Sequence, residues 1–132
     1  MTMSMTFKSL TAAAILALGA TAAQAHGALV SANPAVGSTV GSTSQLKLKF
    51  NEPIKPKFSG ADLTMTSMMM GGKMMNHTMK VDGVSARVDP KDSKTLLVSS
   101  KSRLAPGSYK VSWHVVTGDN HRVTGDYAFN IR

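Results

Sequence analysis

Short runs of alternating apolar and polar residues recur along this chain, and no helical period persists for ten residues. Alternation with a period of two puts successive side chains on opposite faces and is typical of half-buried β-strands. The clearest runs cover 46–50, 109–115 and 127–131, and Gly, Pro, Asn and Asp residues separate them. With weaker segments at 28–31, 79–82 and 85–89, we expect seven or eight strands. The sequence therefore predicts an all-β domain, either a two-sheet antiparallel sandwich or a Greek-key barrel.

Residues 1–25 have the pattern of a secretory signal peptide. Lys8 is the only charge before a run of apolar and small residues, and Ala23-Gln24-Ala25 has the A-x-A form of a cleavage site. The run is shorter than the roughly 20 apolar residues that a membrane-spanning helix needs, so an uncleaved anchor is the less favoured alternative. Removing 25 of the 132 residues leaves 107, the length of one domain. We expect an exported domain, 26–132, that begins at His26.

The composition excludes several classes of protein. There is no cysteine, so thiolate metal sites are excluded, including the blue-copper centre that requires a Cys ligand. The formal net charge is +8, but the basic residues are dispersed and do not interleave with aromatic residues. We therefore expect no nucleic-acid partner. The positive charge is expected to aid solubility, and peripheral contact with an anionic membrane is the other role considered for it.

Seven of the ten methionines lie between Met65 and Met79, and His77 lies among them. Thioether sulfur is a soft ligand that selects Cu(I), and imidazole also binds copper. Met65 continues a strand pattern and fits a core, whereas the methionines on both sides of Gly71-Gly72 fit one poorly. The two glycines predict a loop that interrupts two strands. The alternative interpretation is an apolar recognition surface, a common use of methionine.

A second group of candidate ligands is harder and lies far from the methionines in the sequence. After signal cleavage, the α-amine and the imidazole Nδ1 of His26 can chelate one metal ion. Asp119 and His121 are two residues apart, so in an extended segment they face the same side. Nitrogen and oxygen donors in a tetragonal plane favour Cu(II), which also stands highest among the divalent metals. Zinc could use the same ligands in a tetrahedron.

Several motifs in order give the chain a specific resemblance over 26–132. They are the N-terminal His after an A-x-A signal, Leu29-Val30-Ser31, Asn33-Pro34-Ala35-Val36-Gly37-Ser38, Leu48-Lys49-Phe50-Asn51-Glu52, Phe58-Ser59-Gly60-Ala61, Leu104-Ala105-Pro106-Gly107-Ser108-Tyr109-Lys110-Val111, Trp113-His114-Val115-Val116, Asp119-Asn120-His121 and Thr124-Gly125. In these motifs the chain resembles the CopC/PcoC family of periplasmic copper-resistance proteins. The resemblance implies a cupredoxin-like Greek-key β-barrel or sandwich of about seven strands, with Cu(II) and Cu(I) sites at opposite ends.

The resemblance also implies the ligands. The Cu(II) ligands correspond to His26, Asp119 and His121, and Glu52 corresponds to a nearby acidic residue or a weak ligand. The Cu(I) ligands correspond to Met65, Met68, Met75, His77 and Met79. The chain departs from the family pattern by extra residues, Met69 to Met74, so Met70 or Met74 could replace an assigned ligand. It also has one residue between His77 and Met79 where the pattern has two, and His114 where the pattern has arginine.

The function expected from these features is that of a periplasmic copper carrier or buffer in copper resistance and homeostasis, without enzymatic activity. The resemblance implies partners such as a multicopper oxidase, an outer-membrane copper protein and an inner-membrane copper transporter. One alternative is a copper-dependent oxidase or monooxygenase that uses an N-terminal histidine brace. A chain this short with one Trp and two Tyr offers little for a flat polysaccharide-binding face. Another alternative is a structural module whose methionines grip an apolar partner.

Overall fold

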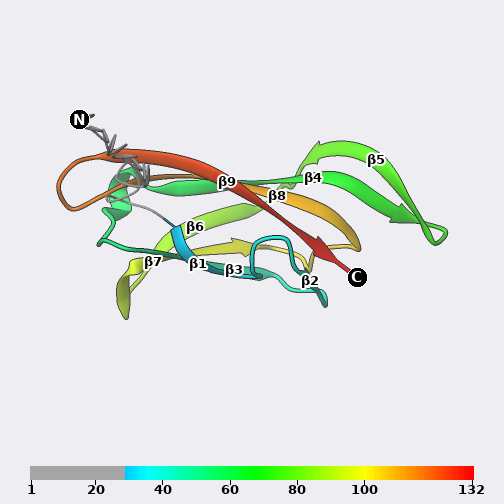
Figure 1. The fold of residues 1–132 in the computed structure, drawn as a ribbon, viewed down its shortest axis with the longest axis horizontal. Coiled ribbons are helices and arrows are strands. Elements are labelled where there is room, and N and C mark those ends of the chain that lie inside the picture. Colours follow the sequence, from blue (N-terminus) through cyan, green and yellow to red (C-terminus); the bar gives the residue numbers. More distant parts are fainter. Residues whose placement is uncertain (1–28) are drawn as a thin grey trace, which may run out of the picture.

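Two β-sheets form the domain, which the computed structural model describes for residues 29–132 (Figure 1). Their strands pair antiparallel, except for the short parallel pair of β2 with β9. One sheet has four strands in the order β1-β3-β7-β6, and the other has five in the order β2-β9-β8-β4-β5. The bounds are β1 Leu29–Asn33, β2 Thr39–Val40, β3 Gln45–Phe50, β4 Gly60–Met70, β5 Lys73–Lys80, β6 Val84–Asp89, β7 Asp92–Ser100, β8 Gly107–Val116 and β9 Arg122–Ile131, with a short 3-10 helix, η2, at Pro56–Phe58. The expected all-β sandwich is confirmed, with nine strands in 29–132 rather than seven or eight.

The core lies between the two sheets and is built from the alternating residues that the sequence indicates. In β3 every second residue is buried, and in β8 the buried face includes Tyr109, Val111 and Trp113. An edge-to-face pair links the layers, since Phe50 of β3 contacts Trp113 of β8 at 6.0 Å between ring centroids. Within the five-stranded sheet, Tyr109 stacks on its cross-strand neighbour Phe129 at 5.5 Å. This aromatic core fixes the sandwich without any disulfide.

The methionine-rich segment is a β-hairpin rather than an open loop. β4 runs to Met70 and β5 begins at Lys73, so only Gly71 and Gly72 remain between them. Both glycines have positive φ, 56° and 78°. A two-residue hairpin turn of type I′ requires this conformation at both central residues, and glycine adopts it readily. The expected interruption is confirmed, but it is reduced to this turn. In Figure 1 the tip of the hairpin projects past the other strands of its sheet.

The region before residue 29 lies outside the described residues, and with it the expected signal peptide and His26. Within residues 29–132, no helix has both the length and the apolar character that a membrane crossing requires.

Candidate metal centres

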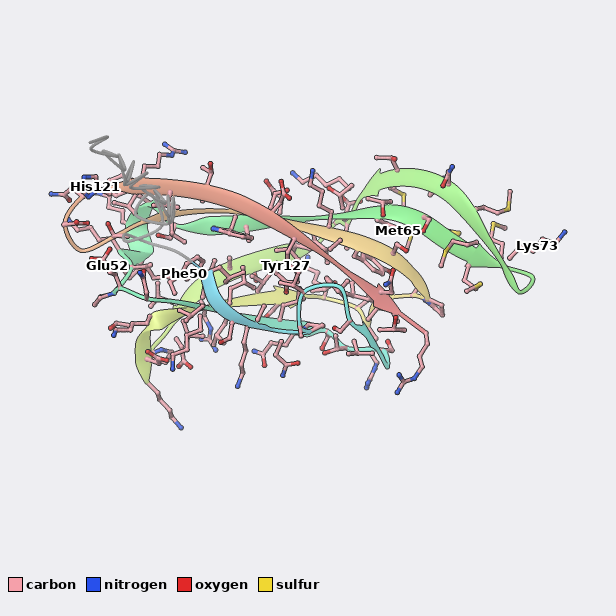
Figure 2. All side chains as sticks on the ribbon, viewed as in Figure 1. Phe50, Glu52, Met65, Lys73, His121 and Tyr127 are labelled. Carbon is pink, nitrogen blue, oxygen red and sulfur yellow. The ribbon has the colours of Figure 1, made fainter. Side chains whose placement is uncertain are left out.

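The two groups of candidate ligands that lie in the described residues occupy opposite ends of the sandwich. Figure 2 shows His121 at one end, in the turn between β8 and β9, and Lys73 at the other end, at the tip of the β4–β5 hairpin. Sulfur atoms gather around that hairpin in the same view. The expected separation of the soft and hard donors along the molecule is therefore present in the fold.

Four of the five predicted Cu(I) ligands form two cross-strand pairs in the hairpin. Met65 of β4 is opposite Met79 of β5, and Met68 is opposite Met75. Residues directly opposite in an antiparallel pair have Cβ atoms about 4.5–5.5 Å apart and lie on the same face of the sheet. Each pair thus offers two thioethers that can approach one ion.

Both pairs lie on the face of the hairpin that continues the core face of the sheet, which we call the inner face. Met65 is buried, with 4% of its surface exposed, and Met68 packs against the core while remaining partly exposed. Their partners Met79 and Met75 share that face but are exposed. The prediction that Met65 belongs to the core is confirmed. The expectation that Met68 fits a core poorly is wrong, because Met68 packs against the core from the inner face.

The fifth predicted ligand, His77, lies in a β-bulge between these two pairs. From the Met65–Met79 pair to the Ser67–Asn76 pair, β5 has two intervening residues, His77 and Thr78, where β4 has one, Thr66. An extra residue of this kind bends the strand and re-aims the neighbouring side chains. Along β4, Met65 and Met68 are three residues apart, a spacing that would place them on opposite faces of a regular strand. Against β8, however, Thr66 is an extra residue, since Met65 pairs with Tyr109 and Ser67 with the adjacent Ser108. This irregularity in β4 keeps both methionine pairs on one face.

A surface pocket lies where the hairpin meets the body of the domain. Met65 and Met79 line it, together with Leu104, Tyr109 and Arg103. The thioethers nearest the core thus border a partly enclosed and largely apolar space. A soft, weakly hydrated ion is better suited to such surroundings than a hard, strongly hydrated one.

At the opposite end, Asp119 and His121 are in direct contact. His121 Nδ1 lies 2.8 Å from Asp119 Oδ2, and the other carboxylate oxygen of Asp119 accepts a hydrogen bond from the hydroxyl of Thr117. When Nδ1–H donates to the carboxylate, the lone pair of the imidazole is on Nε2. A carboxylate that orients a histidine in this way fixes the tautomer and raises the basicity of the nitrogen that binds metal.

Asp119 is held in its charged form. The hydrogen bond from Thr117, and then that from His121, lower the pKa of Asp119 from 3.8 to about 2. Hydrogen bonds to a carboxylate favour ionisation because they stabilise the negative charge. The carboxylate is therefore anionic at neutral pH.

The turn that presents these two residues is tied to the neighbouring loop. Gly118 N–H donates to Pro53 O at 3.0 Å, and Lys55 Nζ donates to Asn120 Oδ1. Asn120 takes a left-handed conformation with φ of 67°, which Asn tolerates better than most residues. The bond to Pro53 brings the segment that carries Glu52, a half-buried residue, to this end of the sandwich, where Figure 2 shows it with His121.

Two of the three predicted Cu(II) ligands are thus adjacent, and the third lies outside the described residues. Within residues 29–132 no three His, Cys, Asp or Glu side chains come together as a metal-binding group. The sequence predicts His26 as the further donor beside Asp119 and His121.

Thr117 is a site residue that the sequence reasoning missed. It is fully buried, and besides contacting Asp119 its backbone N–H donates to His121 O at 2.9 Å. The available signal was its position two residues before an aspartate in a Gly-containing turn, where Ser and Thr hydroxyls bond to nearby acceptors. His114, in contrast, lies on the face of β8 opposite Trp113, as its alternation predicts.

The class defined by this architecture is that of small β-sandwich domains with candidate metal ligands at both ends. Within that class, the family model of the CopC domain matches residues 29–132, and the chain belongs to the CopC family. Copper resistance protein C of Pseudomonas syringae pv. tomato is 40% identical over 111 residues, which cover 83% of each chain. Copper resistance protein C of Escherichia coli is 37% identical over 111 residues, 83% of this chain and 84% of that protein.

Solved structures give the same assignment. The crystal structure of PcoC, described as a methionine rich copper resistance protein from Escherichia coli, matches with a TM-score of 0.71 and 33% identity, over 82% of this chain and 100% of that one. CopC from Methylosinus trichosporium OB3b matches with a TM-score of 0.61 and 27% identity, over 80% of this chain and 93% of that one. The CopC/PcoC resemblance predicted from the motifs is confirmed.

Proposed function

We propose that this protein binds copper in the periplasm and carries or buffers it in copper resistance and homeostasis. Its membership of the CopC family and its likeness to proteins named for copper resistance support this proposal. The signal-peptide pattern of residues 1–25 supports the location. The observation that carries the proposal is the register of the hairpin, which pairs Met65 with Met79 and Met68 with Met75 on one face.

In this proposal the inner face of the hairpin binds Cu(I). The two methionine pairs and His77 supply more donors than the three or four that one ion uses, so copper can move by exchange of one thioether for another. The exposed members, Met75 and Met79, are accessible to the thioethers of a partner protein. Exchange between similar soft ligands lets copper pass without release into water.

The turn between β8 and β9 binds Cu(II) in the same proposal. His26 provides its α-amine and imidazole, and His121 provides an imidazole nitrogen. The contact between His121 Nδ1 and Asp119 supports either of two roles for the carboxylate, a direct ligand or a hydrogen-bond acceptor that orients the histidine. Glu52 lies at this end as an additional acidic group. The copper-handling partners implied by the resemblance belong to this proposal as recipients or donors of the ion.

The experiment is a copper titration of the chain that begins at His26, compared with a matched sample carrying one extra residue before it. Cu(II) binding is followed by electron paramagnetic resonance, and Cu(I) binding by anaerobic competition with a chromophoric chelator. We expect one tetragonal Cu(II) with nitrogen donors, weakened by the extra residue because acylation removes the amine ligand. We also expect an independent Cu(I) that the extra residue does not affect.

Two results would overturn this assignment. If the extra residue leaves Cu(II) binding unchanged, His26 does not chelate the ion. If Cu(I) does not bind, the hairpin is an apolar recognition surface. The rival enzymatic function is tested in the same samples, since the copper-loaded protein should oxidise ascorbate no faster than free copper does.

A further inference from the structure

A third methionine pair lies at the tip of the hairpin. Met69 of β4 is opposite Met74 of β5, and one residue pair, Met70 and Lys73, separates them from the Gly71-Gly72 turn. These two residues fall within the extra segment that separates this chain from the family pattern. Met69 is not among the candidate ligands named above, and Met74 was named only as a possible replacement for one of them.

The third pair lies on the opposite face of the hairpin from the other two. Successive residues of a strand point to alternate faces, so Met69 and Met74 point away from the face that carries Met68 and Met75. We call this the outer face. The neighbouring pair on the outer face is Ser67 and Asn76. Lys73, the only cation at the tip, is opposite Met70 and therefore lies on the inner face.

Packing does not account for the outer pair. Met69 is 41% exposed and Met74 is 49% exposed, and neither belongs to the hydrophobic core of residues 29–132. Exposed thioethers are vulnerable to oxidation, which makes them costly in an exported protein. Met69 and Met74 are, however, cross-strand neighbours with long, flexible side chains, so both sulfurs can reach one ion.

We propose that Met69 and Met74 form a second Cu(I) site on the outer face of the hairpin, separate from the inner-face site. This inference rests on the proposed function in taking Cu(I) as the cargo. Ser67 and Asn76 offer only hard oxygen and nitrogen donors, so the protein contributes two soft ligands here. The remaining coordination positions are filled by solvent or by an incoming thioether.

The two faces differ in what surrounds the ion. On the inner face, Met65 is buried and borders the pocket with Tyr109, so a bound ion is partly enclosed. On the outer face, Met69 and Met74 are both exposed to solvent. The outer site therefore binds more weakly, exchanges faster and is the first contact for copper that enters or leaves the hairpin.

The test is an NMR titration of the chain beginning at His26, labelled with 13C at the methionine methyl groups. Ag(I) is the probe, because it is a soft ion of the same charge as Cu(I) and is stable in air. Single Met→Leu variants assign each resonance. We expect the inner-face methyls to shift during the first equivalent of Ag(I), and the Met69 and Met74 methyls to shift together during the second.

The double variant Met69→Leu with Met74→Leu should lose the second equivalent and keep the first. Met70→Leu is the matched control, since Met70 lies next to Met69 in β4 but on the inner face, and this variant should keep the outer equivalent. The proposal is overturned if the Met69 and Met74 methyls do not shift, or if they shift with the first equivalent as part of one larger site. If they shift while the inner-face methyls do not, the inner-face site of the proposed function fails and the outer site stands.

Discussion

The buried hydroxyl of Thr117 donates a hydrogen bond to the same carboxylate, that of Asp119, which holds the imidazole of His121. A chain of contacts thus runs from the interior of the sandwich to the exposed histidine. Thr117 therefore influences the orientation of the His121 imidazole through Asp119. Cu(II) affinity should accordingly depend on Thr117.

Replacing Thr117 by Val keeps the shape of the side chain and removes its hydroxyl. Partners that orient a metal-binding group typically contribute 10–100-fold to metal affinity, so we expect Cu(II) binding to weaken by about that factor. Competition titration with a Cu(II) chelator measures the change. Thr95→Val is the matched control, because Thr95 is also buried and donates to an aspartate, Asp92, at 2.8 Å. Equal effects in the two variants would contradict the role of Thr117.

Changing Met65, Met68 and Met79 together to Leu should separate a copper site from an apolar surface. Leu has nearly the volume of Met, and such swaps usually cost less than about 1.5 kcal/mol each, so the domain should remain folded. Cu(I) affinity should fall by more than about 100-fold, since losing direct ligands costs more than losing groups that orient them. Anaerobic Cu(I) competition and circular dichroism give the two readouts. Undiminished Cu(I) binding in a folded variant would show that these thioethers are not the ligands.

Gly125 lies opposite Trp113 in the β8–β9 pair, and a Cβ at this position would clash with the indole ring. Gly125→Ala should therefore destabilise the fold by about 1–3 kcal/mol, the usual cost of overpacking a core. Urea denaturation measures the change in the free energy of unfolding. Gly41→Ala is the control, because no atom lies within 4 Å of its added Cβ, and it should change stability by less than about 0.5 kcal/mol. A Gly125→Ala variant as stable as the control would show that the indole moves aside freely.

Tyr127 should make the fold sensitive to alkali. Burial raises its pKa from 10.0 to about 12, so the folded state keeps the phenol proton more tightly than the unfolded state does. The stabilisation is complete below pH 10 and is lost as the pH rises from 10 to about 12. In Tyr127→Phe this part of the alkaline loss should disappear, as measured by urea denaturation across that range.

The same variant carries a prediction at neutral pH. The Tyr127 hydroxyl has no hydrogen-bond partner within residues 29–132, so its removal should leave the stability unchanged or raise it. Tyr109→Phe is the comparison, because the Tyr109 hydroxyl donates to Ala105 O at 2.6 Å and its loss should cost about 1 kcal/mol. A stability loss in Tyr127→Phe as large as that in Tyr109→Phe would contradict this difference.

Local alternation was enough to predict the strands that form the core. The runs 46–50, 109–115 and 127–131 became β3, β8 and β9, and Met65 is buried as its pattern predicts. Side-chain alternation follows directly from strand geometry, so it can be recognised without knowing which strands pair.

The arrangement of the methionines could not be predicted in the same way. A shift of one residue in strand register moves every side chain to the other face, and the register here depends on the bulge at His77 and Thr78. Thr117 was missed for a related reason. Its burial depends on a distant segment, since Ile54 forms an isolated β-bridge with it. Sequence identified the chemical types of the candidate ligands, whereas pairing between strands decides which of them face one another.

The position of β5 at the edge of its sheet, paired only with β4, has an evolutionary consequence. Lengthening the hairpin by two methionines on each strand would add one thioether pair to each face and leave the turn and the core undisturbed. Adding one residue to each strand would instead reverse which face the tip methionines occupy. The number of thioether pairs on this hairpin can therefore grow or shrink in discrete steps while the domain that carries it stays the same.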